Sequence, residues 1–137
     1  FENEFLADYH FDITSLGVEN DKFDLIICYH ILEHIIEDIL AMKELFRVLK
    51  PKGKIMIQTP FLGDSIYEDY SINTPELRLK HFGQKDHVRI YAALGLENRL
   101  KDVGFKTEIL LFSKNDYLGL SDNEHVILAW KDEYHTL

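Results

Sequence analysis

Three side chains that could bind a metal ion follow directly on an apolar run of the sequence. The run is Phe23–Tyr29, and His30, Glu33 and His34 come after it. If the intervening residues turn helically, the three side chains stand on one face at i, i+3 and i+4. Two imidazoles and one carboxylate could hold a divalent metal there, and H-x-x-E-H also matches the inverted zinc-protease pattern. The alternative is that Glu33 and His34 cap and position the following helix.

A second segment with chemically active residues is Phe82–Tyr91. Asp86 and His87 could form an oriented acid–base pair in it, with Arg89 clamping an anion. The alternative is a solvated loop whose charges pair with one another and contribute little individually. The residues alone leave both interpretations open.

A third place of interest is Asp12, which follows a weak strand candidate over Phe5–His10. Beyond the end of a strand, its carboxylate could accept a hydrogen bond from an amino group such as the N6 of adenine. The alternative is an Asx turn, which aspartate forms readily by bonding to its own backbone. Taken without further context, the sequence favours the turn.

The elements that must position these residues alternate in the order that builds a parallel sheet. Phe23–Tyr29 is a nearly continuous run of β-formers, typical of a strand buried on both faces. The apolar spacing predicts a helix over 36–49, stopped by Pro51 and Gly53, and then a strand over 54–59. This order predicts a right-handed crossover and a parallel pair. Later elements are a helix over 94–103 and an antiparallel pair of strands over 107–112 and 124–130.

A long irregular segment, 61–91, separates the second of these strands from the later helix. Thr74 and Pro75 supply an N-cap and a first-turn proline for a short helix that reaches Phe82 and ends at Gly83. Connections of this length usually act as lids or binding loops. We therefore expect a lid-like insertion at about 61–91.

The composition sets limits on partners and location. The chain has 137 residues and a net charge of −9, which argues against nucleic-acid binding and against docking on an anionic membrane. The single cysteine, Cys28, excludes an internal disulfide and fits a reducing, cytoplasmic setting. We expect its thiol to be a small buried hydrophobe rather than a nucleophile.

A series of motifs resembles the class I S-adenosylmethionine-dependent methyltransferases, in their small-molecule, type 11-like branch. The motifs are F-D-x-I over Phe23–Ile26, L-E-H over Leu32–His34 and E-L-x-R-V-L-K-P-x-G over Glu44–Gly53, and the resemblance covers about Tyr9–Trp130. It implies a partial, Rossmann-like α/β methyltransferase sheet. The strands would be 3 to 7 of the family's order 3-2-1-4-5-7-6, with the last one antiparallel.

The resemblance also implies where the cofactor, S-adenosylmethionine, would bind. Asp12 is expected near the adenine amino group, with Ile13 packing on the ring. Tyr29 and His30 are expected at the methionine end of the cofactor, next to the substrate. A divalent metal on His30, Glu33 and His34 is a further expectation.

The same resemblance implies which residues act on the acceptor. Methyl transfer needs an aligned acceptor and, where required, the removal of its proton. We expect His30 or His87 to be that base, and Arg89 and Tyr91 to contact the substrate.

One family feature is missing, because the sequence contains no G-x-G-x-G cofactor loop. The resemblance therefore implies that 1–137 is the C-terminal part of a methyltransferase domain, inactive or weak without its N-terminal half. The strand over Leu25–Tyr29 would then expose an unpaired edge, through which two copies could form a homodimer.

The expected function is methyl transfer to a small-molecule or sugar-type acceptor. Two alternatives remain open: a non-catalytic methyltransferase-like binding or assembly module, and a metal-dependent hydrolase that uses His30, Glu33 and His34.

Overall fold

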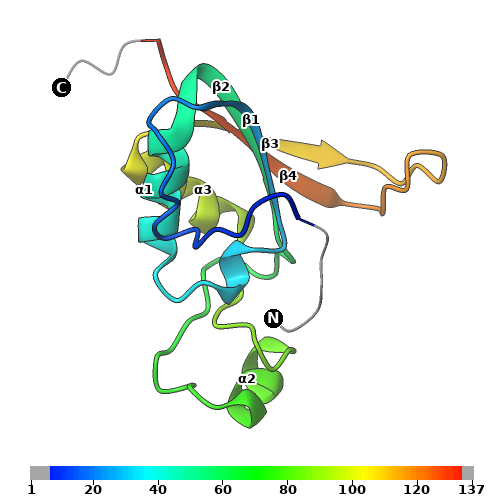
Figure 1. Ribbon diagram of the computed structural model, residues 1–137. Helices are drawn as coiled ribbons and strands as arrows, with labels where there is room; N and C mark the ends of the chain where they lie inside the picture. The colour runs from blue at the N-terminus through cyan, green and yellow to red at the C-terminus, as the bar shows by residue number, and fades with distance from the viewer. Residues whose placement is uncertain (1–6, 134–137) are drawn as a thin grey trace.

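A four-stranded sheet in the order β1-β2-β4-β3 organises the chain. The computed structural model describes residues 7–133, and α1 and α3 cover one face of the sheet while α2 lies in a separate lobe (Figure 1). The helices and strands are β1 (Phe23–Tyr29), the short 3-10 helix η1 (Leu32–His34), α1 (Asp38–Val48), β2 (Leu49–Gln58), α2 (Pro75–Phe82), α3 (Ala93–Val103), β3 (Lys106–Phe112) and β4 (Glu124–Trp130).

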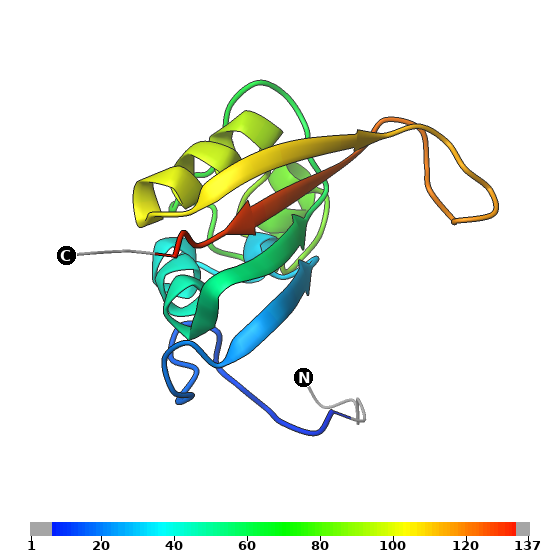
Figure 2. The same cartoon turned by 90° about the horizontal axis from the view of Figure 1, so that it is seen from above.

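The pairing of the strands confirms the predicted topology. β1 and β2 run parallel, with Ile26 opposite Ile55. β4 runs antiparallel to both β2 and β3, so the antiparallel pair is appended to the parallel one (Figure 2). The partial Rossmann-like α/β fold is therefore present in this chain.

Helix α1 lies on the sheet through an apolar stripe. Ala41, Met42, Leu45 and Val48 are buried, which is the spacing of one helical face. The helix begins two residues later than predicted. It ends at Val48 because Leu49 is already extended and starts β2, so the segment expected to be a helix stop belongs to the strand. Among the described residues, no helix is both long and apolar enough to span a membrane.

The core lies between the sheet and the two helices that cover it. The buried residues that meet there are Cys28, Ile55, Ile57, Ile127 and Ala129 from the strands and Met42, Leu45, Leu96 and Leu100 from the helices. They come from the covered face because successive side chains of a strand point to opposite faces.

On the opposite face of the sheet, the side chains of β1 are exposed within residues 7–133. Leu25 is 55% exposed and Ile27 63% exposed, so β1 is not buried on both faces as the sequence pattern predicted. β1 is also an edge strand, because Ile26 pairs with Ile55 on one side only in the described part of the chain. A homodimer through this edge stays a prediction.

The weak strand candidate over Phe5–His10 does not form where it can be checked. Residues 7–10 are in no strand, and residues 5 and 6 lie outside the described part of the chain. Tyr9 is 74% exposed. No described strand pairs with residues 7–10.

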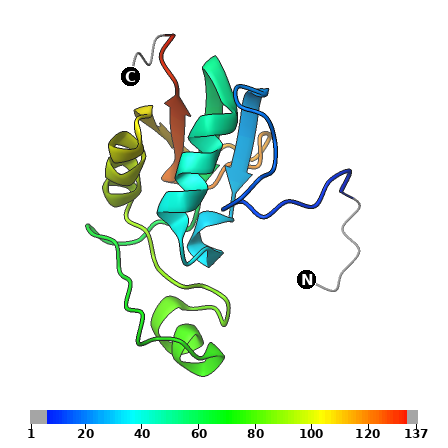
Figure 3. The ribbon, with the colours of Figure 1, turned by 60° about the vertical axis from the view of Figure 1, so that its left-hand side comes forward.

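The lobe over 61–91 is closed at its base and carries α2 (Figure 3). Thr74 caps α2 by accepting a hydrogen bond from the Leu77 N–H at 3.2 Å, and Gly83 ends it with a φ of 83°, as predicted. Isolated bridges between Phe61 and Tyr91 and between Tyr67 and Ile90 join the two arms of the lobe.

Candidate functional site

The chain leaves β1 through a left-handed residue. His30 has a φ of 54°, which few residues other than glycine adopt, and its backbone N–H donates to the Gln58 carbonyl at 2.9 Å. The turn leads into η1 at the carboxyl ends of β1 and β2, where ligands bind in open α/β sheets. Tyr29 and His30 are exposed at this edge, and their roles toward a cofactor stay predictions.

Glu33 is buried in η1 without a hydrogen bond. Its relative exposure is 1%, and neither carboxylate oxygen has a hydrogen-bond partner among the described residues. The nearest basic nitrogens to Oε1 are His30 Nδ1 at 3.5 Å and His34 Nε2 at 3.9 Å. A buried carboxylate in this state is costly, so it calls for an explanation.

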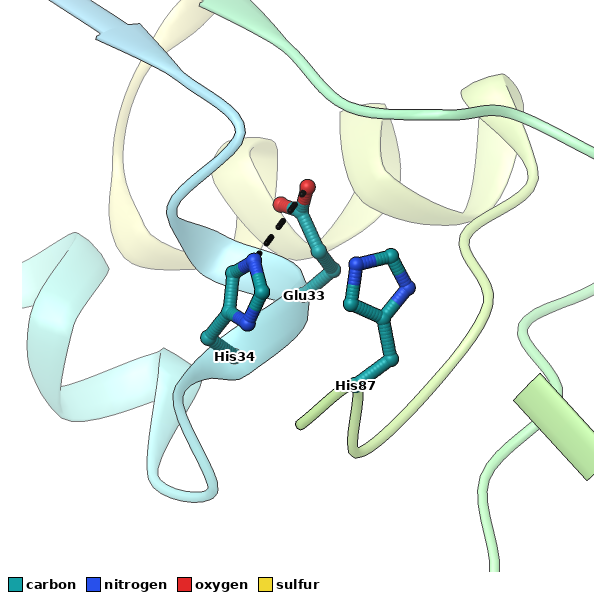
Figure 4. Close-up of side chains that lie close together, drawn as sticks. All are labelled: Glu33, His34 and His87. Carbon is teal, nitrogen blue, oxygen red and sulfur yellow. Dashed lines mark ion pairs between the residues drawn. The ribbon is translucent and has the colours of Figure 1, made fainter. Parts of the chain in front are cut away.

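Two histidines flank that carboxylate from different segments of the chain (Figure 4). His34 comes from η1, and His87 comes from the loop after α2. Their rings meet edge to face with centroids 4.6 Å apart. Burial, and then the neighbouring His34, lower the pKa of His87 from its usual value, because both disfavour an imidazolium there.

The metal-ligating set predicted from sequence differs from the group that the structure brings together. Glu33, His34 and His87 place one possible ligand atom each within 4.8 Å of one another, and His30 is not part of the group. The helical face expected for His30, Glu33 and His34 does not form, because the left-handed turn at His30 precedes η1. The sequence singled out His87 only as a base. No local spacing links it to Glu33, because a long lobe separates them.

Arg89 links the loop that carries His87 to the turn that carries Glu33 by hydrogen bonds. Its guanidinium is 1% exposed and donates to the carbonyls of Leu32, Ile35 and Ile36. The Val88 N–H adds a bond to the Glu33 carbonyl at 2.9 Å. The side chain expected to clamp a substrate anion is therefore engaged inside the chain, and its substrate role stays a prediction.

Arg89 belongs to a buried ion network that the sequence analysis did not identify. Its Nε lies 2.8 Å from Glu68 Oε2. Arg99 binds both Glu68 and Asp38, and the Tyr91 hydroxyl donates to Asp38. Tyr91 is fully buried, so it ties the lobe to α1, and its expected contact with substrate stays a prediction.

A cavity of about 200 Å³ opens beside Glu33. The Thr59 hydroxyl, which follows β2, is buried on the same side without a hydrogen-bond partner among residues 7–133. The lining residues are Glu33, Thr59, Leu62, Phe82, His87 and Arg89, among others. The cavity therefore combines polar groups that need partners with apolar walls, which is typical of a small-molecule site.

Asp12 forms the local turn that the sequence favoured. Its Oδ1 accepts from the Thr14 N–H at 2.9 Å and from the Thr14 hydroxyl at 2.7 Å. These bonds lower the pKa of Asp12. Ile13 lines an apolar cavity of about 450 Å³ beside β1. Contact of Asp12 and Ile13 with an adenine stays a prediction.

Cys28 is a buried core residue, in line with the sequence interpretation. Its relative exposure is 3%, and burial, with a smaller contribution from Glu33, raises the pKa of its thiol to about 12. A thiol with so high a pKa holds almost no thiolate at neutral pH, so it is a poor nucleophile.

Solved structures with this fold include S-adenosylmethionine-dependent methyltransferases. A possible histamine N-methyltransferase from Thermotoga maritima matches with 16% identity and a TM-score of 0.57, over 85% of this chain and 59% of that one. An S-adenosylmethionine-dependent methyltransferase from Archaeoglobus fulgidus matches with 14% identity and a TM-score of 0.61, over 88% of this chain and 65% of that one. A third match is phosphoethanolamine N-methyltransferase 2 of Haemonchus contortus, solved with S-adenosylmethionine. Its identity is 19% and its TM-score 0.60, over 88% of this chain and 36% of that one.

This chain thus spans less than two thirds of the length of each of these three structures. At such identities the likeness establishes the fold. No curated protein matches the chain. Residues 3–109, well over half of the sequence, match a family described as a methyltransferase domain, and the chain belongs to that family.

Proposed function

We propose that this chain forms the acceptor side of an S-adenosylmethionine-dependent methyltransferase that methylates a small-molecule or sugar-type acceptor. The observation that carries the proposal is the cavity of about 200 Å³ at the carboxyl ends of β1 and β2. Glu33, Thr59 and His87 line it, and it has room for a small polar group rather than a polymer. Membership of the methyltransferase domain family supports the reaction class.

His87 is the base in this proposal, with His30 as the second choice. The sulfonium of the cofactor already activates the methyl group, so the protein must align the acceptor and take its proton. The lowered pKa of His87 keeps its imidazole neutral at neutral pH, and a neutral imidazole can accept a proton. His30 lies at the same edge of the sheet but is exposed.

The cofactor would bind along the edge that begins at β1. Tyr29 and His30 would face its methionine end, because they follow the strand directly. Asp12 and Ile13 would face the adenine, and the apolar cavity that Ile13 lines suits a flat ring. A reducing, cytoplasmic location belongs to the same proposal, since the one cysteine forms no disulfide.

The affinity for S-adenosylmethionine tests whether these 137 residues can bind the cofactor by themselves. The sequence holds no G-x-G-x-G loop, and such loops let the backbone approach a nucleotide closely. We expect calorimetry of this chain with S-adenosylmethionine to give weak binding or none. A micromolar dissociation constant would contradict that part of the proposal.

Methyl transfer itself is tested on the polypeptide expressed from its complete reading frame. The assay supplies S-adenosylmethionine labelled in its methyl group and a panel of small hydroxyl and amine acceptors. For an acceptor that is methylated, His87→Ala should lower kcat by about 10²–10⁴-fold, and His10→Ala, at an exposed position, should leave it unchanged. An unchanged kcat in the His87 variant would exclude His87 as the base.

The first alternative, a non-catalytic binding or assembly module, predicts a different outcome of the same assay. No acceptor would be methylated, although the folded protein would still bind a small molecule. The second alternative, a metal-dependent hydrolase, is disfavoured by membership of the methyltransferase domain family.

A further inference from the structure

The buried Glu33 carboxylate needs a positive partner that the described residues do not supply as a hydrogen-bond donor. Both of its oxygens lack a hydrogen bond there, while the side chain is 2% exposed. An ionised carboxylate away from water is retained in proteins when it is paired or coordinates a metal. A cation therefore belongs beside Glu33.

The hydrogen bonding of His34 shows which of its nitrogens faces that cation. Nδ1 lies 3.2 Å from the Asp86 carbonyl and 3.3 Å from the Asp86 carboxylate oxygen Oδ2. Both are acceptors, so Nδ1 carries the proton. In the neutral ring the lone pair of Nε2 then points toward Glu33 Oε1, 3.9 Å away. A metal-binding histidine is held in this way, with its other nitrogen donating to a carbonyl or carboxylate.

His87 completes a three-sided arrangement around the Glu33 carboxylate (Figure 4). The possible ligand atoms of Glu33, His34 and His87 lie within 4.8 Å of one another. Ligands of one zinc ion stand about 3.4 Å apart, given bonds of about 2.1 Å in a tetrahedron. Small side-chain rotations therefore suffice to close the site around an ion.

We propose that Glu33, His34 and His87 bind one divalent transition-metal ion. Two imidazoles and one carboxylate suit zinc, manganese or iron, whereas magnesium prefers oxygen ligands alone. Three protein ligands leave a position open, and the cavity of about 200 Å³ lined by Glu33 and His87 adjoins the site. An acceptor oxygen or nitrogen could take that position. This last role rests on the proposed methyl transfer, but metal binding does not. With His87 bound to the ion, His30, the second choice, would take the proton of the acceptor.

The test is a Co²⁺ titration of the metal-stripped chain without cofactor or acceptor, followed by calorimetry and by visible absorption. We expect one equivalent to bind, with the d–d bands of a site containing nitrogen ligands. Glu33→Gln and His87→Ala should each weaken binding by at least about tenfold, and the exposed-site control His10→Ala should leave it unchanged. Circular dichroism shows that each variant is folded.

His30→Ala separates this site from the set that the sequence predicted. We expect a smaller loss of Co²⁺ affinity than in His87→Ala, because His30 lies outside the group of three. An equal or larger loss would overturn the assignment of His87. The proposal also falls if the wild-type chain takes up no Co²⁺. A failure of methyl transfer would leave this titration unaffected.

Discussion

Two clusters of ionisable side chains contact η1 or belong to it, and they differ in how completely their members are hydrogen-bonded. In the network of Asp38, Glu68, Arg89 and Arg99, every charged group has an opposite charge in contact. In the group around Glu33, the carboxylate has no hydrogen bond among the described residues. Buried networks that are fully satisfied fix one conformation, whereas a buried carboxylate without a hydrogen bond calls for an explanation such as a bound ion.

The largest expected effect comes from removing the centre of the paired network. Arg89→Met should lower the free energy of unfolding by about 3–5 kcal/mol, because Glu68 and three backbone carbonyls lose a buried partner. Urea denaturation measures it, and Lys80→Met on the exposed side of α2 is the control. A loss no larger than that of the control would mean that the network does not hold the lobe.

A smaller loss should follow from deleting one hydroxyl of the same network. Tyr91→Phe leaves Asp38 with Arg99 but removes a buried hydrogen bond. We expect about 1–3 kcal/mol of destabilisation in urea denaturation. Equal stability of the two proteins would show that Asp38 is satisfied by Arg99 alone.

The cluster around Glu33 should respond with the opposite sign. Glu33→Met replaces a buried carboxylate with an apolar side chain of similar size, so in metal-free buffer it should raise the free energy of unfolding by about 1–2 kcal/mol. Added Zn²⁺ should stabilise the wild-type chain and leave the variant unchanged. A clear loss of stability in metal-free buffer would mean that Glu33 already has a stabilising partner.

The smallest effect belongs to a pair at the surface. The hydrogen bond from Arg47, and then that from the Leu16 N–H, lower the pKa of Glu44 to about 2. A carboxyl with a lowered pKa stabilises the fold above its unfolded value of about 4.5, and the contribution fades as the pH falls toward 2. Glu44→Gln should remove about 1 kcal/mol or less at neutral pH. Urea denaturation at pH 7 and pH 3 should show the difference between the proteins shrinking at the lower pH.

Much of the fold could be predicted from the sequence, because periodicity and capping are local signals. Phe23–Tyr29 has the bounds that its run of β-formers predicted, and Thr74 and Gly83 delimit α2 as expected. The expectation that failed depended on neighbours: β1 is not covered on its second face in the described chain. A strand pattern reports what a side chain prefers, but not whether another segment is there to cover it.

The candidate site was predictable only in part. Glu33 and His34 stand out in the sequence because they follow a strongly apolar strand. Their meeting with His87 depends on how the lobe folds back, which Arg89 controls through carbonyl contacts. Backbone carbonyls carry no sequence signature. From sequence alone, an arginine in a polar loop is therefore interpreted more readily as a ligand-binding group than as a buried donor to backbone carbonyls.

The lone cysteine provides a chemical probe of local unfolding in this protein. Cys28 lies on the covered side of β1, the edge strand, and lines the apolar cavity of about 450 Å³. Burial raises the pKa of its thiol to about 12, and the residue is only 3% exposed. The rate of labelling by a thiol-specific dye therefore reports how often this part of the chain opens. Comparing this rate with and without added metal would reveal whether a loaded site at the end of β1 restrains the helix that covers the strand.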